Sequence, residues 1–474
     1  MDELIAPWLT AGIGSLLAAS SIVSFPTMQG HTRVIAVTAC ATSLLLSLAT
    51  LCEWAMAGWT TLSEPLVPAL FSAGALNAIP MALFSMLALV SVLSSPKRDS
   101  DGKTVSGILT LTAGALMAYA SGNLTVFLAG WMIALIPCLT RASRAGNSRS
   151  SLLEIAASTA LLGTGAILAT VGAQPFYAFT CLLFAAILRT GLFPFHGVAA
   201  ARFEKGSLGL TGLLLNSLLG PFLVVRFAQP LFPTVAQNVL PWVCALALFT
   251  AIYTAALGTV EREPRRLLAL VFVSQSSAIF AGFAILRPVG FAGALVQWIV
   301  LGVTSTVMIS ICRAIEARIS QPLSGERLFG LASQMPRLAV FFAVCAFALV
   351  GLPGTLGFPG EDLLIHGMLT AHPLIGILLP AAIAINAYLL FRLFSRLFLG
   401  GPIAAWAGAP DALPRERWAF AACLVLLVWG GLVPQQVVGL LSPAVKLQNS
   451  LIGTMTAHDD RQSAHDNRQS IGAR

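Results

Sequence analysis

The sequence has very few charged residues for its length. Only 10% of its 474 residues are Asp, Glu, Lys or Arg, whereas about 25% is usual in a soluble domain, which must keep a polar surface. Hydrophobic residues make up 57% of the chain, and the mean hydropathy is +0.86. This composition excludes a soluble globular fold. The apolar residues form runs of roughly 18 to 25, the length of a helix that crosses about 30 Å of hydrocarbon. We therefore predict an all-α, polytopic membrane protein.

Patterns that hold cofactors, metals or disulfides are also missing. The eight cysteines lie singly in apolar runs, without a Cys-x-x-Cys pair or a neighbouring histidine, so neither a disulfide framework nor a metal site is expected. No flavin, nicotinamide, iron–sulfur or haem motif is visible, and we predict no cofactor. Any redox chemistry would belong to partners, so the chain is not expected to be an enzyme on its own. The net charge of +8 comes from basic residues in short loops, which gives no reason to expect nucleic acid as a partner.

Apolar runs between polar breaks predict about fourteen transmembrane helices. The N-terminus is acidic where a cleaved signal peptide carries positive charge, so the first span is expected to be retained. The expected spans cover residues 5–25, 34–58, 67–95, 105–121, 124–139, 152–172, 176–200, 207–229, 239–258, 266–286, 290–312, 337–371, 373–397 and 417–441.

Basic residues are concentrated in alternate loops, and this distribution predicts the orientation of the chain. Cytoplasmic loops of membrane proteins collect Lys and Arg. Twenty basic residues fall in loops on one side, whereas Arg226, Arg287 and the C-terminal tail supply those on the other. We therefore expect a multi-pass protein of the cell inner membrane with both termini periplasmic or outside. Residues 97–103 and 141–149 belong to the basic loops and are expected in the cytoplasm.

The last residues of the chain, 451–474, are polar and show no apolar periodicity. The pentapeptide DDRQS at 459–463 is nearly repeated as DNRQS at 466–470. A segment of this composition cannot bury enough apolar surface to offset the entropy of ordering, so we expect a disordered and dispensable tail.

Ionisable residues deep in a membrane span are costly and usually mark functional sites. The candidates are Arg189 and His196 in the seventh span and Glu361, Asp362 and His366 in the twelfth. Both spans also contain residues that interrupt a helix, namely Pro194 in the seventh and Pro353, Gly357, Pro359 and Gly360 in the twelfth. Broken helices in corresponding halves of a chain indicate a transport site, and kinks that only improve packing are the alternative. Glu53 and Glu154, near span ends, are expected to be solvated.

Three motifs carry a resemblance to a known family. They are Phe193-Pro194-Phe195-His196, Arg265-Arg266-Leu267-Leu268-Ala269 followed by Val273-Ser274-Gln275, and Gly351-Leu352-Pro353 followed by Gly357-Phe358-Pro359-Gly360-Glu361. Over roughly residues 75–400 the chain resembles the antiporter-like membrane subunits of respiratory complex I (NADH:quinone oxidoreductase), membrane-bound hydrogenases and multi-subunit sodium/proton antiporters.

The resemblance implies two inverted repeats, spans four to eight and nine to thirteen, around two discontinuous helices. It also implies a division of the chain along its length. The parts are N-terminal transmembrane helices (1–104), a proton-conducting antiporter-like core (105–400), a C-terminal transmembrane helix (401–450) and the polar tail (451–474).

Several positions depart from the family pattern. Charged residues of the family in spans five, seven, eight and eleven correspond here to Met132 (after Trp131), Arg189, Leu218, Gln297 and Ser305, whereas Glu361 keeps a charge. The family's seventh-span residue is a lysine, and a lysine desolvated in a membrane can release its proton. A guanidinium stays protonated to beyond about pH 12, so Arg189 is expected to be a fixed positive charge instead of a proton carrier.

The other candidate residues have structural interpretations as well. Glu361 and Asp362 follow the Pro/Gly break and could cap the second half-helix, although we favour Glu361 as a proton carrier. Asp362 and His366 are four residues apart on one helix face, which suits either a tuned pair or an ordinary contact, and we favour the contact. His196 is interpreted as a structural or gating residue at the end of its span.

Two functions are weighed at this point. The first is an ion-translocating subunit, moving protons by way of Glu361 and internal water, in a redox-linked or carbon-uptake-linked complex. The second is a degenerate, non-conducting scaffold that anchors a catalytic partner, which the missing carboxylate of span five favours. A lipid-embedded enzyme would need a cluster of acids or histidines at one membrane face, and the sequence contains none. The expected partners are other membrane subunits, a peripheral catalytic subunit and the lipid bilayer.

Overall fold

The structure is a computed structural model that describes residues 2–28, 30–96, 101–144, 149–172, 174–323, 325, 328–401, 403, 406 and 408–472. The orientation argument also uses Lys97, Arg98 and Arg327, which lie outside the described residues together with parts of the loops 97–103 and 141–149.

Helices account for most of the described chain. Those of the first half are α1 (Trp8–Ser24), η1 (Pro26–Met28), α2 (Thr32–Met56), α3 (Ala78–Leu93), α4 (Gly102–Ala120), α5 (Leu124–Arg144), α6 (Arg149–Val171), α7 (Pro175–Thr190), α8 (His196–Lys205), α9 (Leu208–Asn216), α10 (Leu219–Leu223), the π-helical turn η3 (Val224–Ala228) and α11 (Gln229–Leu231). Those of the second half are α12 (Pro233–Val260), α13 (Pro264–Ala284), α14 (Pro288–Ile319), η4 (Leu331–Ser333), α15 (Pro336–Leu349), α16 (Gly357–Ala371), α17 (Pro373–Gly376), α18 (Leu378–Phe398), α19 (Pro414–Leu432) and α20 (Pro434–Gly472).

Three strands of two residues each form a small sheet near the N-terminus. β1 (Asp2–Glu3) pairs in parallel with β2 (Leu62–Ser63), which pairs antiparallel with β3 (Ser72–Ala73). The sheet ties the start of the chain to the segment between α2 and α3. It leaves the predicted all-α architecture of the molecule unchanged.

Proline sets the start of many of these helices. It lacks a backbone N–H, and the first N–H groups of a helix have no partner within that helix, so its fixed φ suits the first turn. Helices that begin with proline include α7, α12, α13, α14, α15, α17, α19 and α20.

Eight helices of the described chain are long and apolar enough to cross a membrane, or nine if the bent pair α19–α20 counts as one span. Four further apolar helices, α1, α3, α7 and α15, are shorter. The protein is therefore an all-α, polytopic membrane protein, as its composition predicts. The count of about fourteen spans stays a prediction.

α13 and α14 form the centre of the bundle. All residues of the apolar 18-residue stretch of each of these two helices are buried, compared with 33% of the corresponding stretch of α2 and α6. α13 contacts α7, α8, α10 and α12 as well as α14, α16 and α18. Outer helices expose large apolar side chains, such as Trp242 at 78%, which suits contact with lipid.

The C-terminal part differs from the sequence-based prediction in two respects. The span predicted at 417–441 is two helices, because α19 ends at Leu432 and α20 leaves it at a bend of 89°. Pro434 cannot continue α19 but can open a new helix.

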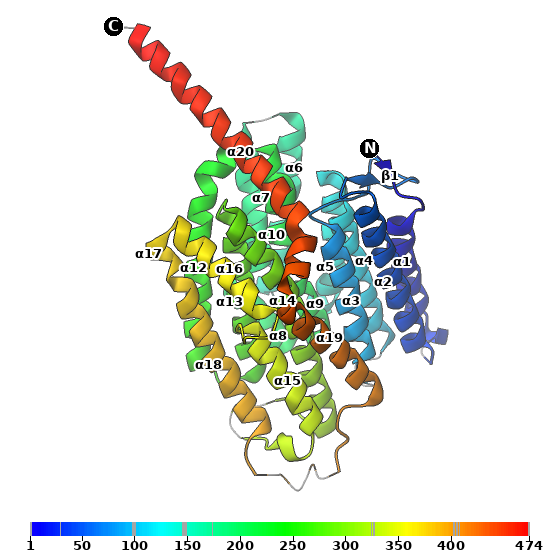
Figure 1. Ribbon diagram of the computed structural model, residues 1–474. Helices are drawn as coiled ribbons and strands as arrows, with labels where there is room; N and C mark the ends of the chain where they lie inside the picture. The colour runs from blue at the N-terminus through cyan, green and yellow to red at the C-terminus, as the bar shows by residue number, and fades with distance from the viewer. Residues whose placement is uncertain are drawn as a thin grey trace.

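The tail predicted to be disordered continues α20 as a helix to Gly472 and projects from the bundle (Figure 1). No Pro or Gly interrupts 454–471, and extending a helix costs less than nucleating one.

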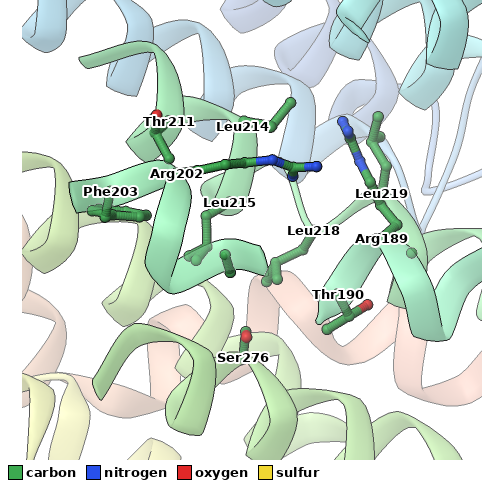
Figure 2. A pocket seen from close by; sticks show the side chains of 12 residues that line it. Arg189, Thr190, Arg202, Phe203, Thr211, Leu214, Leu215, Leu218, Leu219 and Ser276 are labelled. Atoms are coloured by element: carbon green, nitrogen blue, oxygen red, sulfur yellow. The ribbon is translucent and has the colours of Figure 1, made fainter. Parts of the chain in front are cut away.

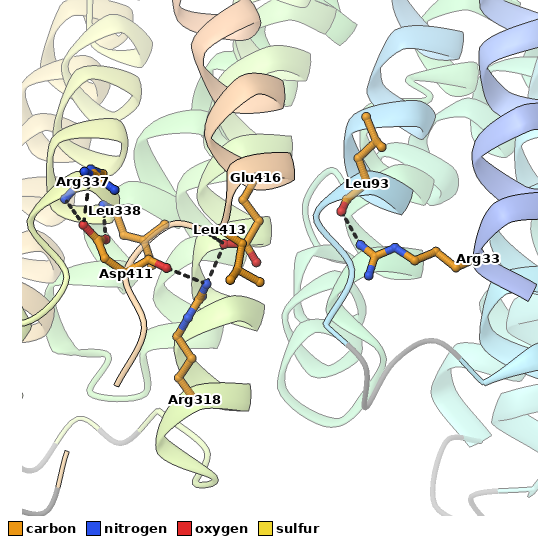
Figure 3. Close-up of polar contacts among 8 residues, drawn as sticks. All are labelled: Arg33, Leu93, Arg318, Arg337, Leu338, Asp411, Leu413 and Glu416. Carbon is orange, nitrogen blue, oxygen red and sulfur yellow. Dashed lines mark hydrogen bonds and ion pairs between the residues drawn. The ribbon is translucent and has the colours of Figure 1, made fainter. Parts of the chain in front are cut away.

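The two ends of the bundle differ. Both termini lie at one end in Figure 1, and the segments that join α14 to α15 and α18 to α19 lie at the other. At that second end Arg318 of α14 forms an ion pair of 2.6 Å with Glu416 of α19, and the backbone N–H groups of Arg337 and Leu338 donate to Asp411 (Figure 3). Arg318 therefore ties α14 to α19, and Asp411 ties the start of α15 to the segment that precedes α19.

Candidate ion pathway

The chain interrupts two helices. α7 ends at Thr190 and α8 begins at His196, and α15 ends at Leu349 and α16 begins at Gly357. We call residues 191–195 the first break and residues 350–356 the second break. Of the residues predicted to interrupt helices, Pro194 lies in the first break and Pro353 in the second, and Gly357, Pro359 and Gly360 lie in the first turn of α16.

Both breaks begin with the same local structure. A glycine follows each helix in the left-handed conformation, Gly191 with a φ of +78° and Gly351 with a φ of +72°. The next residue, a leucine in both cases, donates its N–H to the carbonyl five residues earlier. These bonds are Leu192 to Ile187 at 3.2 Å and Leu352 to Phe347 at 3.0 Å. This is the Schellman ending of a helix, in which glycine avoids the steric cost of a positive φ.

Glu361 is buried against the second break. Its exposed fraction is 7%, and its Oε1 atom has no hydrogen-bond partner among the described residues. A Cβ on Gly351 would overlap Glu361 Oε2, so the carboxylate occupies the space that the glycine leaves open. An acidic group held at a helix break without a hydrogen bond on one oxygen is a candidate proton carrier.

A run of polar residues on α13 connects the two breaks. Residues 274–277 are all buried. Gln297 Nε2 of α14 donates to Gln275 Oε1 at 3.2 Å and lies 3.4 Å from the carbonyl of Leu349, where α15 ends. Ser276 lines a cavity beside the first break. α13 and α14 therefore carry a row of neutral polar groups, Ser276, Gln275 and Gln297, from one break to the other.

Two further groups of neutral side chains lie in the core. Asn386 of α18 donates to Ser274 Oγ at 2.8 Å. Ser305 Oγ donates to Asn216 Oδ1 at 2.8 Å, and Asn216 Nδ2 donates to Thr306 Oγ1 at 3.0 Å. Amides and hydroxyls of this kind both donate and accept hydrogen bonds, so they can order internal water, but they carry no charge themselves.

Arg189 lies beside the first break, where its guanidinium group is buried. None of its three nitrogens has a hydrogen-bond partner among the described residues. The guanidinium carbon lies 5.1 Å from the ring centroid of Trp131, a cation–π contact. Met132, the position of the missing family carboxylate, is 44% exposed. The α5 side chain that contacts Arg189 is therefore Trp131.

A second arginine reaches the same cavity. Arg202 of α8 and Arg189 of α7 both line it, with Leu214, Leu218 and Leu219 around them (Figure 2). Arg202 forms an ion pair with Glu154 of α6, whose side chain is 5% exposed. The prediction that Glu154 is solvated is therefore wrong, because α8 packs against α6 and covers that carboxylate.

The remaining predicted site residues lie elsewhere. His196 stacks on Phe193 at 6.0 Å between ring centroids and meets the edge of Tyr253 at 5.1 Å, in an aromatic cluster at the first break. Asp362 and His366 are exposed on α16, on a different face from Glu361. The structure thus does not bring these two residues to the buried carboxylate.

A larger cavity of about 310 Å³ lies at the end of the bundle that carries the basic loops. Its lining includes Arg141, Arg265, Arg313 and Glu316. Arg265 Nε donates to Glu316 Oε1 at 2.7 Å, and Arg313 Nη2 donates to Ser95 Oγ at 2.7 Å. Charged walls and this volume suit a water-filled vestibule.

Sequence reasoning missed part of this arrangement. It did not identify Gln275 and Ser276 as the link between the breaks, nor Asn386 beside them. A signal was present, because residues 274–277 are a polar run inside an otherwise apolar helix. Among the described residues, no group of three or more His, Cys, Asp or Glu could hold a metal ion.

Residues 150–385, about half of the chain, match the family described as "NADH:quinone oxidoreductase/Mrp antiporter, TM". Together with the two broken helices and the polar row between them, this match defines the class of the protein. The chain belongs to this family of antiporter-like membrane proteins.

Curated relatives of the chain include subunits of NADH-quinone oxidoreductases. NADH-quinone oxidoreductase subunit M of Rickettsia prowazekii (strain Madrid E) is 24% identical over 289 residues, which cover 59% of this chain and 58% of that protein. Subunit M of Mycobacterium tuberculosis (strain CDC 1551 / Oshkosh) is 27% identical over 303 residues, covering 62% and 53%. The chain spans about half the length of the curated relatives it matches.

Solved structures share the fold over nearly the whole chain. A chain of respiratory complex I from Thermus thermophilus with bound NADH superposes with a TM-score of 0.80 at 22% identity, covering 94% of this chain and 99% of that chain. A chain of the Mrp complex from Dietzia sp. DQ12-45-1b gives a TM-score of 0.81 at 19% identity, covering 95% and 98%. The fold is therefore that of the complex I and Mrp antiporter-like membrane subunits.

Proposed function

We propose that this chain translocates protons as an antiporter-like membrane subunit of a redox-linked or carbon-uptake-linked complex in the cell inner membrane. The observation that carries the proposal is Glu361, a buried carboxylate at the second break. One of its oxygens has no hydrogen-bond partner in the described part of the chain. A carboxyl group can take up and release a proton at a site that excludes bulk water. The core, residues 105–400, contains both breaks and the row between them.

The route follows the polar groups. Protons enter from the basic end through the vestibule of about 310 Å³. They then move along water held by Gln275 and Gln297 and reach Glu361. Arg189 contributes a fixed positive charge at the first break instead of a step in the relay, because a guanidinium does not release its proton.

The energy for transport comes from partners. Membrane subunits cover part of the apolar outer surface, lipid covers the rest, and a peripheral catalytic subunit supplies the chemistry. The relatives named above are subunits of NADH-quinone oxidoreductases, which favours a redox partner.

A non-conducting scaffold is the second candidate. It is favoured by Gln297 of the row and by Ser305 outside it, which stand where a basic residue is expected from the family resemblance. It is also favoured by Arg189, which cannot relay protons. A scaffold would still need the bundle but not Glu361.

Two glutamine substitutions distinguish the two candidates. Gln297→Leu removes the link between α14 and the second break, and Gln229→Leu removes a buried glutamine bonded to Gln448, outside the row. Proton flux driven by a pH gradient is measured in vesicles that contain the whole complex, together with the amount of assembled complex. We expect flux to fall in Gln297→Leu and persist in Gln229→Leu. If vesicles with the wild-type complex show no more flux than vesicles without it, the chain does not conduct protons, and the scaffold is its function.

A further inference from the structure

The cavity at the first break is unusual in its charge. Two arginines line it, Arg189 from α7 and Arg202 from α8, and none of the described residues that line it is acidic. Figure 2 shows the Arg202 side chain extending toward Arg189, with Leu214, Leu218 and Leu219 beside them. Two positive groups thus share one small space with largely apolar walls.

Within the residues that the structure describes, a carboxylate balances only one of the two charges. Arg202 has Glu154 as its partner. Arg189 has the ring of Trp131, and its three buried nitrogens have no hydrogen-bond partner among the described residues. A guanidinium has five N–H donors and no acceptor, so leaving all of them unsatisfied in a site of low dielectric is strongly unfavourable. A ring face offsets only part of this cost.

The size of the cavity restricts what can fill it. Its volume is about 30 Å³, and a single water requires roughly 10–15 Å³ by the same measure. A monatomic anion or about two waters therefore fit. A phosphate, a lipid headgroup or an organic carboxylate is too large for this space.

We propose that the cavity between Arg189 and Arg202 binds a halide-sized inorganic anion, with chloride as the natural candidate. The anion accepts hydrogen bonds from Arg189 and neutralises the charge that the described chain leaves unbalanced. The site lies apart from Glu361, and binding of the anion does not depend on whether the chain conducts protons.

The first test measures thermal unfolding of the purified full chain in detergent. Chloride replaces gluconate stepwise at constant ionic strength, since gluconate cannot enter the cavity. Binding to the folded state raises the melting temperature with chloride concentration. We expect this shift in the wild type and its loss in Arg189→Gln.

Arg226→Gln is the matched control. Arg226 is a partly buried arginine of η3. Its Nη2 donates to Ser72 Oγ at 3.3 Å, and it is not among the residues that line this cavity. We expect this variant to keep the chloride-dependent shift. If Arg226→Gln loses the shift as Arg189→Gln does, or if Arg189→Gln keeps it, the proposed site is wrong.

The second test needs no variant and decides the case even if Arg189→Gln fails to fold. Crystals of the wild-type chain grown in bromide are measured at the bromine absorption edge. We expect an anomalous peak between the two guanidinium groups. A map without that peak, with a melting temperature equal in chloride and gluconate, means that the cavity holds water only and overturns the proposal.

Discussion

The two buried ionisable residues at the breaks, Arg189 and Glu361, differ in what their side chains can do. A carboxylate exchanges protons within the physiological range once its surroundings are arranged for it, whereas a guanidinium keeps its charge. Arg189 lies on the ring of Trp131, and Glu361 fills the space above Gly351. In the proposed function the first break therefore carries a guanidinium that takes no part in the proton relay, and the second break supplies the proton carrier.

Replacing Arg189 tests this division of roles. Arg189→Lys keeps a positive charge and adds a group that can release a proton, so we expect proton flux to be retained or increased. Arg189→Ala removes the charge, and we expect altered gating or reduced assembly. Flux per assembled complex is the measurement. Equal inactivity of both variants at normal assembly would contradict a fixed-charge role and point to a specific contact of the planar guanidinium.

At the scale of elements, the two breaks are built alike. Each begins with a glycine of positive φ followed by a leucine whose N–H reaches back to the carbonyl five residues earlier. The shared sequence, Gly191-Leu192 and Gly351-Leu352, supports the proposal that the two halves of the core are repeats. The breaks differ in what packs against them, because a carboxylate lies against Gly351 and an arginine pair lies near Gly191.

Two glycines of the second break separate backbone strain from displacement of the carboxylate. Gly351 and Gly354 both have positive φ, +72° and +89°, so alanine at either costs about 1–2 kcal/mol of stability. A Cβ on Gly351 would overlap Glu361, whereas a Cβ on Gly354 meets nothing within 4 Å. We expect both variants to lower the melting temperature similarly and only Gly351→Ala to lose flux. If Gly351→Ala retains as much flux as Gly354→Ala, the position of the Glu361 carboxylate does not matter for conduction.

The sequence predicted the elements whose cause is local. Proline and glycine act on their own stretch of backbone, so the breaks around Pro194 and Pro353 could be found without a structure. The Glu154–Arg202 pair could not, because it depends on α8 packing against α6, and no local pattern encodes that contact. The polar run on α13 could have identified Gln275 as a functional candidate. Its contact with Gln297 could not be predicted, because it depends on how α13 packs against α14.

At the scale of the whole molecule, both termini lie at one end of the bundle (Figure 1). The opposite end is the charged one, where Arg318 pairs with Glu416 and Asp411 accepts from the start of α15. The positive-inside rule predicts that the charged end faces the cytoplasm. In that predicted orientation the vestibule lined by Arg141, Arg265 and Arg313 would open on the cytoplasmic side. In the proposed function this end takes up protons.

Reporter fusions at two positions test this orientation. Lys103 lies in the first turn of α4 and Gly453 lies in α20. We expect a reporter at Lys103 to be cytoplasmic and one at Gly453 to be outside, because of the asymmetry in basic residues. Reporters that locate both positions in the same compartment would show that the predicted number of spans is wrong.

The most direct test of the proposed function is proton flux in Glu361→Gln. Glutamine keeps the size and hydrogen-bonding capacity of the side chain but cannot titrate. Asp362→Asn is the matched control, because Asp362 is adjacent and exposed. Flux driven by a pH gradient is measured in vesicles that contain the whole complex and is normalised to the amount assembled. We predict background flux in Glu361→Gln with normal assembly and wild-type flux in Asp362→Asn; wild-type flux in Glu361→Gln would contradict a proton pathway through this residue.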